Sequence, residues 1–162
     1  MSGLEDLYRE IILDHYRNPR NRGTLESPPA IRQEGFNPLC GDEVIVYLEK
    51  TSEDKNEARL TVRIDGRGCS ISQSSASLMA QSVNGSTVPE VKKLIKDFKS
   101  LMSIHETNLG GEPEEESPLD PVDTEKMGEL AALQGVVKFP VRIKCATLSW
   151  NTLLQALEEL EH

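Results

Sequence analysis

The chain has 162 residues and a formal net charge of −9, from 18 Lys and Arg against 27 Asp and Glu. This charge argues against nucleic acid or an anionic membrane as a partner and favours a basic protein partner or none. The length predicts one domain over residues 1–162. At this size folding can bury about 70% of the extended chain's surface, so a core can form without disulfides.

The chain has three cysteines, Cys40, Cys69 and Cys145. A secreted protein of this size would more often carry an even set paired in disulfides. The N-terminus shows no basic stretch followed by an apolar run, and the sequence contains no run of about 18 apolar residues. We therefore expect a cytoplasmic protein, with reduced cysteines and no membrane span.

The first segment is expected to form a helix that begins at a capping box of Ser2 and Glu5 and ends before Pro19. Several of its residues fall on one helical face: Leu4, Leu7, Tyr8, Ile11, Ile12 and His15. We expect this face to pack on the core, with His15 at the edge of the contact.

Three segments are then expected to form strands, at about 31–36, 43–50 and 60–65. The second and third alternate apolar and polar residues and predict an antiparallel hairpin with one face on a core. Gly66 and Gly68 are expected to break the last strand just before Cys69.

The second half of the chain is expected to be mostly helical. A helix at 71–83 would place Cys69 at its N-terminus, where the helix dipole favours a thiolate. A second helix is expected from about 87 to 102, and a short one at 127–133. Between them the composition changes from about residue 107 to 123. Residues 110–116 are acidic and almost free of apolar groups, which indicates an exposed insertion.

The last helix is expected to open at Pro140 and to carry Cys145 off its packing stripe. Arg142 lies three residues earlier, so both side chains should point to similar sides. Arg142 is then either a basic group near the cysteine or an exposed helix residue.

The stretch from Asn37 to Asp42 carries the clearest chemical signal. Gly41 permits a turn in which the Cys40 thiolate and the Asp42 carboxylate point into one volume, where they repel unless a cation lies between them. Zinc accepts both ligand types, and Cys69 and Cys145 would complete four ligands. The alternative for each cysteine is a small buried hydrophobe.

These motifs resemble the U-type family of iron–sulfur cluster assembly proteins. The resemblance rests on four stretches: His15–Asn21, Asn37–Asp42, Gly66–Cys69 and Ile143–Cys145. It covers nearly the whole chain. It implies an α+β fold, in which a small antiparallel sheet of about three strands is covered by helices and the cysteines and the aspartate meet at one end.

Two features favour the zinc-dependent sulfurtransferase (SufU) branch of that family. Lys144 stands where the scaffold branch has a histidine, and the acidic insertion is absent from the scaffold branch. Resemblance to the SufU branch implies zinc on Cys40, Asp42, Cys69 and Cys145. It also implies that Cys40 accepts persulfide sulfur from a SufS-like cysteine desulfurase, with cluster-assembly scaffold proteins downstream.

Two other functions remain open at this point. The same residues could bind a [2Fe–2S] cluster in a scaffold protein, or the zinc could be structural in an adaptor without turnover. In the sulfurtransferase interpretation, three thiolates and a carboxylate outweigh the charge of Zn²⁺, and Arg142 is the candidate to offset the excess.

Overall fold

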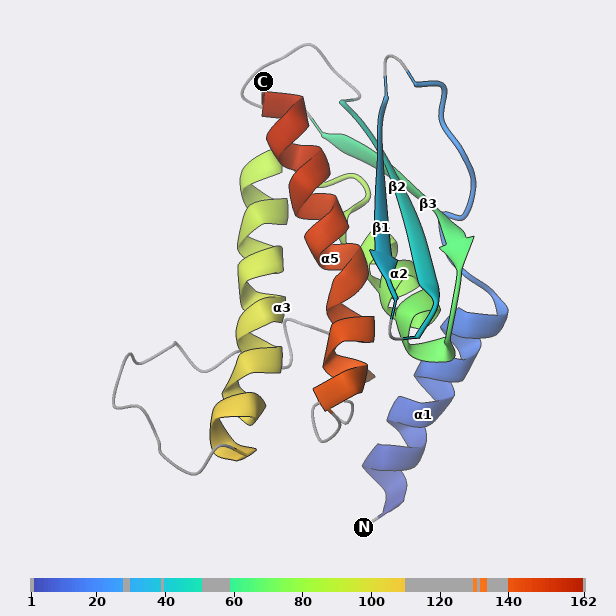
Figure 1. The fold of residues 1–162 in the computed structure, drawn as a ribbon, viewed down its shortest axis with the longest axis vertical. Helices are drawn as coiled ribbons and strands as arrows, with labels where there is room; N and C mark the ends of the chain where they lie inside the picture. Colours follow the sequence, from blue (N-terminus) through green and yellow to red (C-terminus); the bar gives the residue numbers. More distant parts are fainter. Residues whose placement is uncertain are drawn as a thin grey trace.

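The computed structural model describes residues 2–27, 30–38, 40–50, 59–109, 130, 132–133 and 140–161. Within these residues the fold combines a three-stranded antiparallel sheet with four α-helices, which confirms the expected α+β class (Figure 1). The strands are β1 (Ile31–Asn37), β2 (Asp42–Lys50) and β3 (Leu60–Arg67), in that spatial order. The helices are α1 (Ser2–Arg17), α2 (Ser70–Val83), α3 (Val88–Leu109) and α5 (Pro140–Glu161).

The alternation of β2 and β3 gives the sheet one buried face. That face carries six aliphatic side chains, each at most 4% exposed: Val44, Val46, Leu48, Leu60, Val62 and Ile64. Because neighbouring residues of a strand point to opposite faces, the residues between them face outward. The predicted hairpin and its orientation are confirmed.

The helices cover this face from two directions. Helix α5 lies along β1 and β2, and α2 packs on β3 and on α5. The Trp150 ring of α5 stacks on Phe98 of α3 with 4.2 Å between ring centroids, and its Nε1 donates to Ser75 Oγ of α2 at 3.1 Å. The single tryptophan therefore joins three helices in the core.

Helix α1 packs mainly on α2, and Ile11 and Ile12 contact the hydrophobic core beside one buried polar contact. His15 is fully buried, and its Nδ1 lies 2.8 Å from Ser77 Oγ, which also accepts the Arg20 N–H. The expectation that His15 lies at the edge of the contact is wrong, because the small side chains of α2 let α1 approach closely. The expectation that Leu7 packs on the core is also wrong, because its side chain is 54% exposed. Figure 1 shows the first half of α1 extending away from the sheet.

Two boundaries differ from expectation. Strand β3 does not break at Gly66, which pairs with Val44 at a φ of +121°. A Cβ on Gly66 would collide with the Glu43 carbonyl, so glycine permits close strand pairing.

Helix α3 continues to Leu109, into the segment expected to be an insertion, while residues 110–123 lie outside the described residues. Most of the short helix expected at 127–133 also lies outside them, although Leu130, Ala132 and Leu133 are buried.

None of the helices in the described part of the chain combines the length and the apolar character that a membrane span requires.

Candidate metal centre

The candidate centre lies where β1 ends and β2 begins. Asn37, the last residue of β1, pairs with Asp42, the first residue of β2, and both side chains are buried. Between them Gly41 adopts a φ of +69°, the left-handed conformation that glycine accepts without strain. This turn leaves the Cys40 side chain exposed, whereas the Asp42 side chain is fully buried at the end of the sheet.

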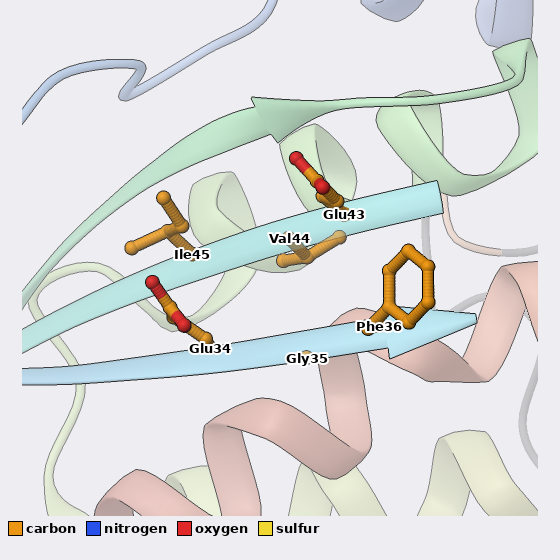
Figure 2. A pocket seen from close by; sticks show the side chains of 6 residues that line it. All are labelled: Glu34, Gly35, Phe36, Glu43, Val44 and Ile45. Atoms are coloured by element: carbon orange, nitrogen blue, oxygen red, sulfur yellow. The ribbon is translucent and has the colours of Figure 1, made fainter. Parts of the chain in front are cut away.

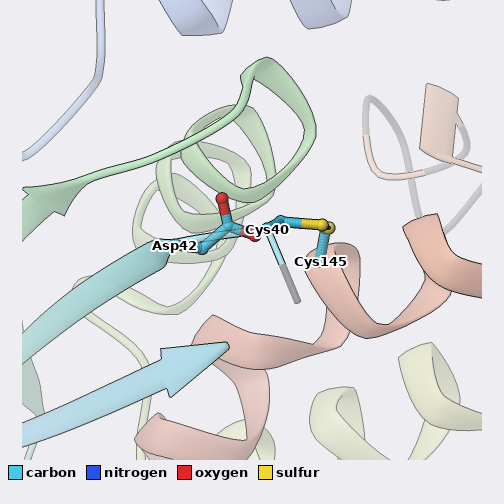
Figure 3. A group of neighbouring side chains, drawn as sticks. All are labelled: Cys40, Asp42 and Cys145. Carbon is cyan, nitrogen blue, oxygen red and sulfur yellow. Dashed lines mark hydrogen bonds between the residues drawn. The ribbon is translucent and has the colours of Figure 1, made fainter. Parts of the chain in front are cut away.

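Three of the four predicted ligands meet within one small volume. Cys40, Asp42 and Cys145 each present one donor atom, and these atoms all lie within 4.8 Å of one another (Figure 3). The Sγ atoms of Cys40 and Cys145 are 3.2 Å apart, and neither residue forms a disulfide. Cys145 comes from the second turn of α5 and is 1% exposed, so the loop and the helix bring together residues far apart in the sequence.

Cys69 adjoins this group through Asp42. It caps α2, as the sequence predicted, and its Sγ accepts the Ser72 N–H at 3.4 Å. Its own N–H donates to Asp42 Oδ1 at 2.8 Å, and its Sγ lies 3.8 Å from Asp42 Oδ2. The Asp42 carboxylate therefore stands at the N-terminus of α2, where the helix dipole stabilises negative charge.

The distances and the donor chemistry fit zinc. A tetrahedral zinc with S and O ligands at its usual bond lengths separates two sulfurs by about 3.8 Å and a sulfur from an oxygen by about 3.5 Å. The two sulfurs of Cys40 and Cys145 are 3.2 Å apart, somewhat closer than this, and Cys69 Sγ lies 3.8 Å from Asp42 Oδ2, somewhat farther. Small side-chain adjustments would therefore suffice to admit the ion.

The electrostatics of the centre also favour a cation. Burial raises the pKa of the Cys145 thiol, and the neighbouring Cys40, Asp42 and Cys69 raise it further. The thiol is thus protonated at neutral pH in the protein alone. A positive ion among these groups would reverse that effect, since it stabilises thiolates.

Asn37 is a further residue of the centre, one that the sequence did not single out. Its Nδ2 donates to Asp42 Oδ2 at 3.5 Å and to Cys145 Sγ at 3.6 Å. The available signal was its place at the start of the cysteine loop, but only the inward direction of its side chain shows that it joins β1, β2 and α5.

Gly68 gives the centre its space. A Cβ on Gly68 would lie 2.5 Å from Asp42 Oδ1 and 2.8 Å from Ser72 Oγ. The sequence predicted this glycine as a strand breaker. Strand β3 does end just before it, at Arg67, and the structure shows in addition that the Asp42 carboxylate packs directly over Gly68.

Arg142 and Lys144 both lie on the first turns of α5 with exposed side chains. Arg142 is therefore on the same helix as Cys145, although Cys145 points inward. The charge-offsetting role of Arg142 stays a prediction.

A three-stranded antiparallel sheet backed by helices, with Cys and Asp donors gathered at one end, defines a small α+β domain with a candidate metal site. Residues 7–146 match the family model of the NifU-like N-terminal domain, and the chain belongs to this family.

Relatives cover nearly the whole chain. It is 36% identical to the zinc-dependent sulfurtransferase SufU of Bacillus subtilis, over 99% of this chain and 95% of that protein. It is 35% identical to the iron–sulfur cluster assembly scaffold protein IscU of Streptococcus pyogenes, over 98% of this chain and 87% of that protein. A crystal structure described as a SUF-system scaffold protein from Fervidobacterium islandicum superposes with a TM-score of 0.70 at 30% identity, covering 96% of this chain and 99% of the other. The family resemblance predicted from the sequence motifs is confirmed.

Proposed function

We propose that the protein is a zinc-dependent sulfurtransferase that accepts persulfide sulfur from a cysteine desulfurase and supplies it to iron–sulfur cluster assembly. The observation that carries this proposal is a cluster of cysteine and aspartate donors in which one thiol, that of Cys40, is exposed. The likeness to a relative named a zinc-dependent sulfurtransferase over almost the full chain supports it. The lysine at position 144, where a scaffold protein of the family would carry histidine, supports the same branch.

In this proposal Cys40, Asp42, Cys69 and Cys145 hold the zinc. When bound, the ion supplies positive charge that keeps the thiols deprotonated at neutral pH. Asp42 is fixed for this role by the Cys69 N–H and by Asn37. Arg142, on the exposed start of α5, would offset the excess negative charge of the thiolates and the carboxylate.

Cys40 is the acceptor in this proposal because its surroundings differ from those of the other cysteines. Its side chain is exposed on a glycine turn, whereas Cys69 caps α2 and Cys145 is buried in α5. The Cys40 thiolate attacks the terminal sulfur of the donor's persulfide. A new S–S bond forms on Cys40, the donor's S–S bond breaks, and its electron pair leaves with the donor's cysteine as a thiolate. The terminal sulfur moves with its proton, and no net oxidation occurs.

A scaffold function is the second candidate, since the Streptococcus relative is named an assembly scaffold at nearly the same identity. The same donors could bind a [2Fe–2S] cluster, because cysteine thiolates are the usual ligands of such clusters. Metal analysis of freshly purified protein separates the two functions. A colourless protein with zinc supports the transferase, and a brown protein with iron and sulfide supports the scaffold.

A purely structural zinc adaptor would leave desulfurase turnover unchanged.

The transferase proposal predicts where sulfur appears first. Zinc-loaded protein is incubated briefly with the desulfurase and cysteine, alkylated, digested and mapped by mass spectrometry. We expect the added sulfur on Cys40 with zinc retained, because the buried Cys145 and the capping Cys69 are less accessible. A sample without cysteine is the control. Sulfur first on Cys69 or Cys145 would contradict the assignment of Cys40, and sulfur on none of the three would contradict the transferase function.

A second prediction concerns Asn37. Asn37→Ala removes the amide that donates to Asp42 and Cys145, so zinc affinity should fall about 10–100-fold, as is typical for groups that orient metal ligands. Affinity is measured by competition with a chromogenic chelator. Gln33→Ala, in the same strand but bonded to Gln155, is the matched control and should bind zinc normally. Equal affinities for the two variants would show that Asn37 does not support the metal.

A further inference from the structure

A hollow of about 330 Å³ opens on the outward face of β1 and β2, beside the candidate metal centre. Six residues line it (Figure 2): Glu34, Gly35, Phe36, Glu43, Val44 and Ile45. Gly35 and Val44 direct their Cβ positions toward the core, so they contribute backbone to the floor. The walls are the other four side chains, and Figure 2 shows both carboxylates standing beside Ile45 and Phe36. We call this feature the Phe36 hollow.

The Phe36 hollow lies next to the metal centre along the two strands. Phe36 pairs with Glu43 across the two strands, and the next pair along is Asn37 with Asp42. One residue of strand spans only about 3.3 Å. A standard protein interface covers about 800 Å² on each partner, which corresponds to a radius of roughly 16 Å. An interface of that size around Cys40 is therefore wide enough to reach the hollow.

Phe36 is a large aromatic side chain that is exposed on the outward face of β1. Its side chain is 60% exposed, although aromatic residues make up only 4% of the chain. The helices pack on the opposite face of the sheet, so they do not shield it. Exposed aromatic side chains beside polar groups are typical anchors of protein interfaces.

The lining also specifies the chemistry of the occupant. Its only charged residues, Glu34 and Glu43, are acidic, and they flank the apolar Phe36 and Ile45. Arg32 contacts Glu34 at 2.7 Å and Arg67 contacts Glu43 at 3.5 Å, but these pairs are largely solvent-exposed. Exposed pairs contribute at most about 1 kcal/mol, so a partner's cation can replace or join them.

We propose that the Phe36 hollow receives an arginine side chain of the sulfur donor. The guanidinium would stack on the Phe36 ring and reach both carboxylates, while its methylene groups contact Ile45. The net charge of −9 agrees with a basic surface on that partner. This inference rests on the proposed function, because the sulfur donor is the protein that must approach Cys40.

The test measures binding of the desulfurase from the same organism by calorimetry, together with its KM and kcat in sulfur transfer. Phe36→Ala and the double variant Glu34→Gln, Glu43→Gln should each weaken binding and raise KM at least tenfold. Zinc content, melting midpoint and kcat at saturating partner should stay unchanged, because the altered side chains are exposed. Phe36→Tyr keeps the ring and should bind as the wild type does.

The matched control is Glu49→Gln, which changes the same kind of charge on the same strand and face but far from the hollow. If Glu49→Gln weakens binding as much as the double glutamine variant in the hollow does, the effect is general charge attraction and the proposal is overturned. Wild-type affinity in both hollow variants overturns it too. If the chain self-associates and Phe36→Ala abolishes that association alone, a second copy is the occupant and the proposal falls.

Binding and transfer are read separately, so the two proposals fail differently. Tight binding that depends on the hollow, with no sulfur on Cys40, would reject the transferase function and retain the docking site. Sulfur transfer with hollow variants that bind normally would reject only the docking site.

Discussion

Stripping zinc from the protein should lower its melting midpoint by about 10 °C or more. The four proposed ligands come from three segments, the cysteine loop, the start of α2 and the start of α5, so one ion would tie together the sheet and two helices. Structural zinc contributes about 10 kcal/mol or more in small peptides, and a fraction of that is several kcal/mol here. For a domain of this size each kcal/mol shifts the midpoint by about 2–4 °C.

The measurement is a thermal melt before and after treatment with a strong chelator, with zinc loss verified by elemental analysis. Adding zinc back should restore the midpoint, and adding magnesium should not, because Mg²⁺ prefers oxygen ligands. An unchanged midpoint after verified zinc loss would mean that the sheet end and the helix starts hold together without the ion.

The sequence predicted the sheet well because its signals are local. Alternation in β2 and β3 and the Pro140 helix start each depend on residues within a few positions of one another. Cys69 at the start of α2 followed from the same kind of reasoning. The convergence of Cys40, Asp42 and Cys145 was also predictable, because a loop and a helix start were expected at one end of the sheet.

What the sequence could not predict depends on which elements meet. His15 is buried because α2 offers the Ser77 hydroxyl, a partner 62 positions away. Leu7 is exposed because the first half of α1 extends beyond its neighbour, which helical periodicity alone does not reveal. Asn37 and Gly68 belong to the centre only because β1, β2 and the start of α2 pack side by side.

The exposure of Phe36 also depends on which elements pack together. Alternation places it on the outward face of β1, but the sequence does not tell whether another element covers that face. The helices cover the other face, and the ring remains in solvent one residue from the metal centre. A local pattern thus predicts which way a side chain points, and the packing decides what it meets.

Replacing Gly68 with alanine should reduce zinc affinity about a hundredfold and abolish sulfur acceptance by Cys40. The new Cβ would lie 2.5 Å from Asp42 Oδ1 and 3.0 Å from Asp42 Cα, so either the carboxylate or the start of β2 must move. A displaced carboxylate loses the Cys69 N–H bond that fixes it at the start of α2. Groups that position metal ligands typically change affinity by this amount when lost.

Gly35→Ala is the matched control, since it also forces a methyl group into a tight contact, with Thr152 of α5, but lies away from the ligands. Overpacking of this kind costs about 1–3 kcal/mol, so both variants should melt earlier than the wild type. Only Gly68→Ala should lose zinc, as measured by chelator competition on folded protein below its melting range. If Gly68→Ala keeps wild-type zinc affinity, the carboxylate of Asp42 does not hold the metal, and the ligand set must be drawn from the three cysteines and another group.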